Sequence, residues 1–166
     1  MSKEIIEAKQ QVVSEIAESF KAAQSSIVVE YRGLTVADMT ELRKALRAEN
    51  VGFKVYKNKL VQRATESAGY AEINDKLVGP NAIAFGHSDA VAPARVLANF
   101  AKTAEALELK CGVVEGTYYD ATGIAAIASI PSRDELLAKF LGSIQSPITN
   151  FARVIKQIAE KNEEVA

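Results

Sequence analysis

The chain has 166 residues, of which 48% are hydrophobic and 25% are charged, and its formal net charge is −1. This size fits one main domain with a small appendage, and the hydrophobic content is sufficient for a core. No apolar run reaches the roughly 18 residues of a membrane-spanning helix, and the charged N-terminus lacks the apolar centre of a signal peptide. The single cysteine, Cys111, excludes an internal disulfide, so we expect a cytoplasmic protein.

The first third of the chain predicts two helices and two strands. Apolar residues recur at steps of three and four over residues 3–23, which is typical of an amphipathic helix. The β-branched and aromatic run Ile27–Tyr31 predicts a strand, and Gly33 provides the following turn. Residues 35–50 open with a Thr-x-x-Asp capping pattern and predict a second helix. Residues 52–56 alternate apolar and polar side chains, which indicates a second strand.

The middle of the chain alternates further helices and strands with turn signals. Residues 58–67 predict a helix, and the asparagine that opens it suits the cap position. The turn at residues 79–81 leads into a third strand over residues 82–85. A helix follows over residues 88–107 and tolerates a proline in its first turn. A fourth strand begins at Leu109, and residues 116–119 extend it.

The order of these elements indicates the fold class. Without the first helix and the segment 58–76, the order is strand, helix, strand, strand, helix, strand, which is the split βαβ pattern. We therefore predict an α+β fold with a ferredoxin-like antiparallel sheet, helices on one face, an extra N-terminal helix, a helical insertion and a detached C-terminal amphipathic helix. An alternating parallel α/β sheet is the alternative.

The composition changes after a short helix that Asp120 caps and Pro131 closes. We therefore divide the chain into a domain of residues 1–130 and a helical segment of residues 131–166. In that segment, an amphipathic helix is expected to end at Ser146–Pro147, and a last helix is expected to continue to about Glu163.

Positive charge is concentrated in one stretch of the chain. Residues 31–63 contain eight basic and three acidic residues, although the whole chain is slightly negative. Such clustering indicates a surface that binds a polyanion. A solvated helix face with many ion pairs is the alternative. The segment Lys54–Lys59 favours the polyanion site, because its charges are closely spaced where a strand leads through a loop into a helix.

The last helix presents an apolar stripe that needs a cover. Its members recur at steps of three and four, and they are Ile148, Phe151, Ile155 and Ile158, with Val154 alongside. A helix this short is marginal alone in water. The stripe therefore packs either on the chain's own domain or on helices that a partner supplies. Its position beyond two prolines favours the partner.

No arrangement of residues in the sequence predicts catalysis. His87 is the single histidine, and it follows a predicted strand, where a surface role is the simpler interpretation. Cys111 alternates with Val113 in a strand and is expected to be a core residue. The chain lacks a P-loop, a dinucleotide-binding glycine motif and any metal-ligand spacing of cysteine and histidine. We therefore predict a protein that is not an enzyme and binds no metal or cofactor.

Three motifs follow the first helix in a fixed order. They are Tyr31–Val36 (YRGLTV), Lys54–Leu60 (KVYKNKL) and Val78–Ile83 (VGPNAI). With the total length and the amphipathic tail, they give a chain that resembles the bacterial large-subunit ribosomal protein of the L-ten family, the scaffold of the ribosomal stalk. Lys59 departs from the family pattern, because many relatives have threonine there. The tail matches as a pattern of apolar positions rather than as fixed letters.

The resemblance implies a division of labour between two ends of the molecule. The N-terminal domain would bind large-subunit rRNA at the GTPase-associated region, beside the L-eleven protein. The C-terminal helix would receive the N-terminal domains of L-seven/twelve stalk dimers, which recruit the translational GTPases. A non-ribosomal RNA-binding regulator and a small α/β enzyme with a dimerising tail are the alternatives.

The resemblance and the charge pattern together select candidate site residues at both ends. The expected rRNA-binding residues are Arg32, Gly33, Lys54, Lys57, Asn58, Lys59, Arg63 and Gly79. The expected stalk-dimer residues are Ile148, Phe151, Val154, Ile155 and Ile158. The cations would neutralise phosphates, the asparagine would contact RNA backbone or a base edge, and the glycines would permit close approach of the main chain.

Overall fold

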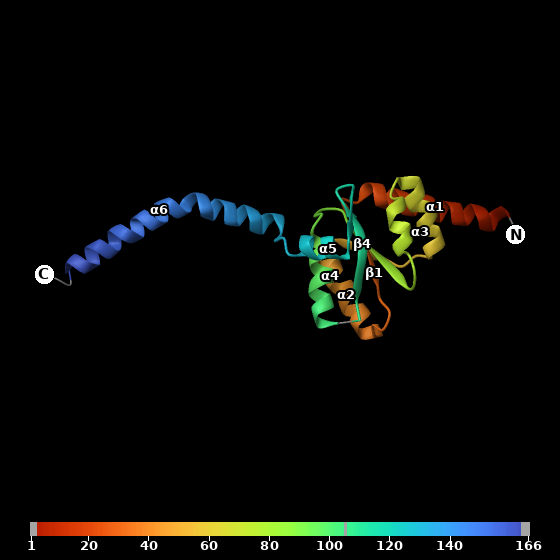
Figure 1. The fold of residues 1–166 in the computed structure, drawn as a ribbon, viewed down its shortest axis with the longest axis horizontal. Coiled ribbons are helices and arrows are strands. Elements are labelled where there is room, and N and C mark those ends of the chain that lie inside the picture. Colours follow the sequence, from red (N-terminus) through yellow and green to blue (C-terminus); the bar gives the residue numbers. More distant parts are fainter. Residues whose placement is uncertain (1–2, 105, 164–166) are drawn as a thin grey trace. The chain divides into compact units, whose positions relative to one another are not determined.

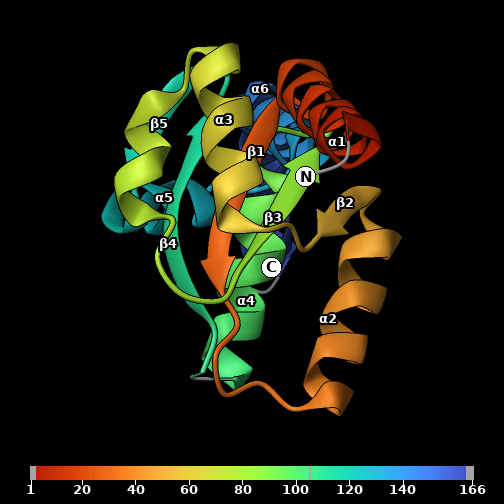
Figure 2. The same ribbon diagram turned by 90° about the vertical axis from the view of Figure 1, so that its right-hand side faces the viewer.

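The computed structural model describes residues 3–104 and 106–163 of the chain. These residues form two compact units, of which the first ends at Ile130 and the second begins at Pro131. Figures 1 and 2 show the ribbon from two directions.

Among the described residues of the first unit, five strands form one antiparallel sheet in the order β2-β3-β1-β4-β5. The strands are β1 (Ser25–Glu30), β2 (Val51–Lys54), β3 (Asn81–Gly86), β4 (Glu108–Val114) and β5 (Thr117–Asp120). The helices of this unit are α1 (Lys3–Ala22), α2 (Val36–Ala48), α3 (Asn58–Ala68), the 3-10 helix η1 (Ala71–Lys76), α4 (Ala92–Thr103) and α5 (Ala121–Ala128). The predicted ferredoxin-like antiparallel sheet is confirmed, and the parallel alternative is wrong.

The edge strand β5 was not expected. Residues 116–119 were predicted to extend the fourth strand, but the chain reverses at Glu115 and Gly116, whose φ angles are +51° and +79°. Two consecutive residues with positive φ are typical of the tight turn of a β-hairpin. Val114 consequently pairs with Thr117, and residues 117–120 return along β4 as a separate strand.

Helices cover both faces of the sheet: α2 and α4, the helices of the split βαβ pattern, lie on one face as predicted, and α1 and α3 cover the other. Ile27 and Val29 of β1 pack in a core with α2, α4 and α5. Val28, between them, packs in a second core with α1 and α3. All three side chains are fully buried. The continuous apolar run in β1 is thus explained, because a central strand with two covered faces needs apolar residues at successive positions. Figure 1 shows α1 and α3 on one side of this strand and α2 and α4 on the other.

The second unit is built on one continuous helix, α6 (Arg133–Glu163), of 31 residues. The predicted break at Ser146–Pro147 is wrong, because Pro147 lies inside this helix. A proline in a helix interior removes one backbone donor and bends the helix without necessarily ending it. Figure 1 shows α6 as a curved ribbon. On the turn around the proline, the Thr149 hydroxyl donates to the Gln145 carbonyl at 3.1 Å.

Candidate nucleic-acid interface and helix-docking stripe

The sheet topology brings the three sequence motifs to one end of the first unit. β3 pairs antiparallel with both β1 and β2, and β1 pairs antiparallel with β4. The C-terminal ends of β1 and β2 therefore lie beside the starts of β3 and β4. Glu30 is in register with Asn81, and Lys54 is in register with Ile83. The segments that follow β1 and β2 and the loop that precedes β3 consequently meet at this end.

These segments enclose an open groove of about 350 Å³, which we call the basic groove. Its lining residues are Tyr31, Val55, Tyr56, Lys57, Asn58, Lys59, Gly79, Pro80 and Asn81. Lys57, Asn58, Lys59 and Gly79 were expected as rRNA contacts, and the structure brings these four together. Gly33 does not line the groove.

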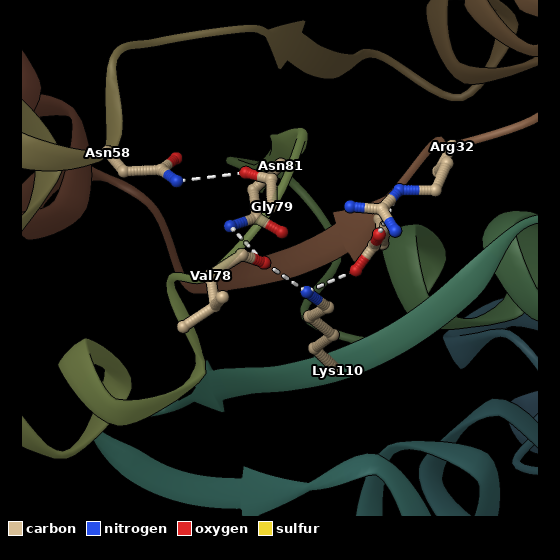
Figure 3. Close-up of polar contacts among 7 residues, drawn as sticks. Arg32, Asn58, Val78, Gly79, Asn81 and Lys110 are labelled. Carbon is tan, nitrogen blue, oxygen red and sulfur yellow. Dashed lines mark hydrogen bonds and ion pairs between the residues drawn. The ribbon is translucent and has the colours of Figure 1, made fainter.

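Asn58 joins the start of α3 to the loop before β3. It was expected to cap this helix, but the cap position belongs to Lys57, and Asn58 is the first helical residue. Its side-chain amide donates to the Gly79 carbonyl at 2.9 Å, as Figure 3 shows. The residue therefore fixes the geometry of the groove, because it holds two of the walls together.

A small polar network anchors the same loop from the opposite side. Lys110 on β4 donates to the Val78 carbonyl and forms an ion pair with Glu30, which also pairs with Arg32 at 3.3 Å (Figure 3). The hydrogen bond from Lys110, with a smaller contribution from Arg32, holds the pKa of Glu30 below its usual value. The Glu30 and Lys110 side chains are only 15% and 17% exposed. The loop is thus held by a largely shielded ion pair as well as by Asn58.

The two expected glycines have reasons within the fold. Gly79 has a φ of +85°, and a Cβ there would lie 3.2 Å from the Glu30 carboxylate. Gly33 has a φ of +90°. Positive φ favours glycine at both positions. Neither glycine therefore requires close approach of RNA as its explanation.

The five expected cations differ in what already surrounds them. Lys57, Lys59 and Arg63 are exposed and form no ion pair within the described part of the chain. Lys59 and Arg63 are four residues apart on α3 and lie on the same helix face. Lys54 instead pairs with Glu15 of α1 at 2.9 Å, and this contact raises the pKa of the lysine. Uncompensated positive charge is therefore concentrated at the start of α3.

The second unit presents an apolar surface along α6, which we call the docking stripe. The stripe consists of Leu137, Leu141, Ile144, Ile148, Phe151, Ile155 and Ile158, each at least half exposed. The steps alternate between four and three residues, which keeps these side chains on one face of a helix. Val154 flanks the stripe and is 50% exposed. All five expected dimer-binding residues thus lie on or beside the stripe, and the stripe continues through Pro147 into the first half of α6.

Two comparisons with known proteins bear on the identity of this chain. The family model of ribosomal protein L10 matches residues 4–102, and that of the ribosomal protein uL10 C-terminal region matches residues 130–165. The large ribosomal subunit protein uL10 of Bacillus cereus (strain B4264) is 56% identical over 164 residues, which cover 99% of this chain and 98% of the relative. The protein of the same name from Bacillus anthracis (strain CDC 684 / NRRL 3495) has the same identity and coverage. The chain belongs to the ribosomal protein L10 family.

Membership in the uL10 family confirms the predicted class of protein. A member of this family is a large-subunit ribosomal protein with a structural role rather than an enzyme, and the ribosome of a bacterium lies in its cytoplasm. Burial raises the pKa of the Cys111 thiol to about 11, which is consistent with the predicted core role. None of the described helices has the length and apolar character needed to cross a membrane.

The sequence interpretation of this uL10-family chain missed Lys110. Val28 is in register with Cys111 and Val29 with Leu109, so Lys110 is an additional residue in β4. Such a β-bulge redirects a side chain, and here Lys110 reaches Glu30. A lysine between Leu109 and Cys111 was the available signal, since a charge inside a buried strand requires a partner. The bulge itself leaves no mark in the apolar pattern.

Proposed function

We propose that the first unit binds large-subunit rRNA through the basic groove and the exposed cations of α3, and that α6 binds the L-seven/twelve dimers. The dimers would in turn recruit the translational GTPases, and the first unit would lie beside the L-eleven protein at the GTPase-associated region. The match of both units to regions of the uL10 family is the observation that carries this proposal. The surface chemistry of each unit supports it separately.

The charges on the first unit suit a phosphate backbone. Folded RNA is recognised largely through its shape, its phosphates and its 2′-hydroxyls. Lys57, Lys59 and Arg63 are available for phosphate, since they form no ion pair within residues 3–104 and 106–163. Arg32 and Lys54 can join them, because their own side chains are 74% and 55% exposed and ion pairs of exposed cations contribute little stability.

The test of the RNA half removes two of the available cations. The double substitution Lys57→Ala and Lys59→Ala should weaken binding to a large-subunit rRNA fragment. It should also make the salt dependence shallower by about 0.7–0.9 for each lost phosphate contact. The matched control is Lys21→Ala with Lys102→Ala, which removes the same charge from exposed positions outside the groove. Equal affinities for the two double variants would exclude this surface.

The docking stripe suits helices supplied by a partner. No other helix or strand is described in the second unit, so nothing within this unit covers the stripe. Burying a large apolar side chain contributes about 1.5–3 kcal/mol, so even part of the stripe could hold a partner firmly. Amphipathic helices commonly associate through residues at this spacing.

The test of the second half removes α6. A chain that ends at Ile130 should keep its affinity for rRNA and lose all binding of L-seven/twelve dimers. The full-length chain should sediment with large ribosomal subunits and bring the dimers with it, whereas the shortened chain should sediment without them. Dimers that bind the shortened chain would exclude α6 as the docking element. A full-length chain that does not sediment with large subunits would instead favour the non-ribosomal regulator.

A further inference from the structure

The basic groove has apolar walls that phosphate binding does not explain. Four of its lining side chains are aromatic or apolar, namely Tyr31, Val55, Tyr56 and Pro80. The Val55 side chain is 44% exposed. Phosphates are held by cations, by hydroxyls and by N–H donors. An exposed apolar surface next to the cations therefore indicates a ligand that has an apolar part as well as phosphates.

The size of the groove restricts the apolar part of the ligand to a small group. Its volume of about 350 Å³ lies near the lower end of the roughly 300–1,000 Å³ found for small-molecule pockets. A hollow of this size has room for one flat ring system, whereas a duplex would only rest on its rim. RNA offers such a ring system wherever a base is unpaired and turned out of its helix.

One amide in the lining is complementary to the edge of a base. The contact of Asn58 with Gly79 uses the Nδ2 atom, and the Oδ1 atom of Asn58 accepts no hydrogen bond in the described part of the chain. The Watson–Crick edge of every base offers an N–H group that can donate to this oxygen.

We propose that the basic groove binds a single unpaired nucleobase of the RNA. The base lies between the aromatic and apolar walls, its edge faces the Asn58 amide, and its flanking phosphates lie on Lys57 and Lys59. Stacking on aromatic side chains is the usual way in which proteins hold an unstacked base. This inference rests on the proposed function, because it concerns the same RNA and the same surface.

The protein side is tested by filling the groove. Val55→Trp places a large side chain in the hollow without removing a charge, and Val36→Trp is the matched control, because Val36 is 85% exposed and outside the lining. Val55→Trp should weaken binding to a large-subunit rRNA fragment about tenfold, the scale of one lost base stack, and leave the salt dependence unchanged. Val36→Trp should bind like the original chain. Circular dichroism establishes that both variants fold.

The RNA side is tested first with the unchanged protein, so its main result does not depend on the folding of a variant. Each unpaired nucleotide of the rRNA fragment is replaced in turn by an abasic one. One position should lose about tenfold in affinity, and this loss should disappear in Val55→Trp, since both changes remove the same contact. Uniform small losses at all positions would overturn the inference.

The outcomes separate this inference from the proposed function. If the Lys57 and Lys59 double substitution has no effect, RNA binds elsewhere and both proposals fail. If that substitution weakens binding but neither Val55→Trp nor any abasic position does, the surface binds RNA and the groove holds no base. If Val55→Trp weakens retention on whole large subunits but not on isolated rRNA, a protein segment fills the groove, and the inference is wrong.

Discussion

The basic groove is assembled from segments that lie far apart in the sequence, whereas the docking stripe comes from a single helix. Asn58 and Gly79 are 21 residues apart, and Lys110 and Val78 are 32 residues apart. The groove therefore exists only when the whole first unit is folded. The stripe needs no more than helical spacing, and its apolar residues contribute stability only when a partner covers them. The loss of an apolar side chain should consequently lower the stability of the first unit, whereas the same loss from the stripe should weaken partner binding and leave the stability unchanged.

The largest expected effect is the fall in stability when a buried aliphatic side chain is removed from the first unit. Ile83 lies on β3, opposite Lys54 in the register, and is 1% exposed. Ile83→Ala should lower the free energy of unfolding by about 2–5 kcal/mol, as measured by urea denaturation, and should weaken RNA binding on warming. The same change in the stripe, Ile158→Ala, should alter stability by less than about 0.5 kcal/mol, because the side chain is 56% exposed. Similar costs at the two positions would contradict the comparison.

The next largest effect is the loss of an anchor from the docking stripe. Phe151 is 67% exposed, and a large aromatic residue at the centre of an interface is a typical binding hot spot. Phe151→Ala should weaken the binding of L-seven/twelve dimers by about 2 kcal/mol or more, which titration calorimetry can measure. Binding of rRNA should not change. A parallel loss of rRNA affinity would show that the two regions are not independent.

The sequence predicted the docking stripe better than it predicted the basic groove. Periodicity alone places Ile148, Phe151 and Ile155 on one exposed face, because helical spacing is a local property. The capping box of Thr35 and Asp38 was likewise correct, since both of its hydrogen bonds span three residues. The break expected at Pro147 was wrong, because the proline removes only one backbone donor and the helix continues on both sides of it.

The groove was only partly predictable, because its geometry depends on contacts between distant segments. The motifs identified Lys57, Asn58 and Gly79 as important, but the bond between Asn58 and Gly79 appears only when β3 lies beside the start of α3. Lys110 was missed, because a bulge is invisible in an apolar pattern. The second covered face of the sheet was missed for a related reason, since the helices α1 and α3 were treated as additions rather than as a layer.

A smaller effect is expected for a helix cap that lies outside the groove. The Thr35 hydroxyl accepts a hydrogen bond from the Asp38 backbone N–H at 3.2 Å at the start of α2. Thr35→Ala should therefore lower the free energy of unfolding by about 0.5–2 kcal/mol, as measured by urea denaturation. Affinity for rRNA at low temperature should stay the same, because α2 supplies none of the lining residues. A large loss of affinity would extend the interface to α2.

The smallest effect is a pH dependence confined to the first unit. The ion pair with Lys110, together with Arg32, holds the pKa of Glu30 below its usual value of 4.5. The carboxylate therefore stabilises the folded state fully above about pH 4.5, and this contribution is lost as the pH falls through the lower folded pKa. Glu30→Gln should lower the melting temperature at neutral pH and reduce its decline in acid.

The control for the acid experiment is Glu115→Gln, which removes an exposed carboxylate that has no ion pair in the described residues. It should leave both the neutral melting temperature and the acid decline close to those of the original chain. If Glu30→Gln behaves in the same way, the ion pair does not hold the loop before β3. In that case, Asn58 alone would keep the basic groove in shape, and Asn58→Ala should then weaken rRNA binding more than Lys110→Met does.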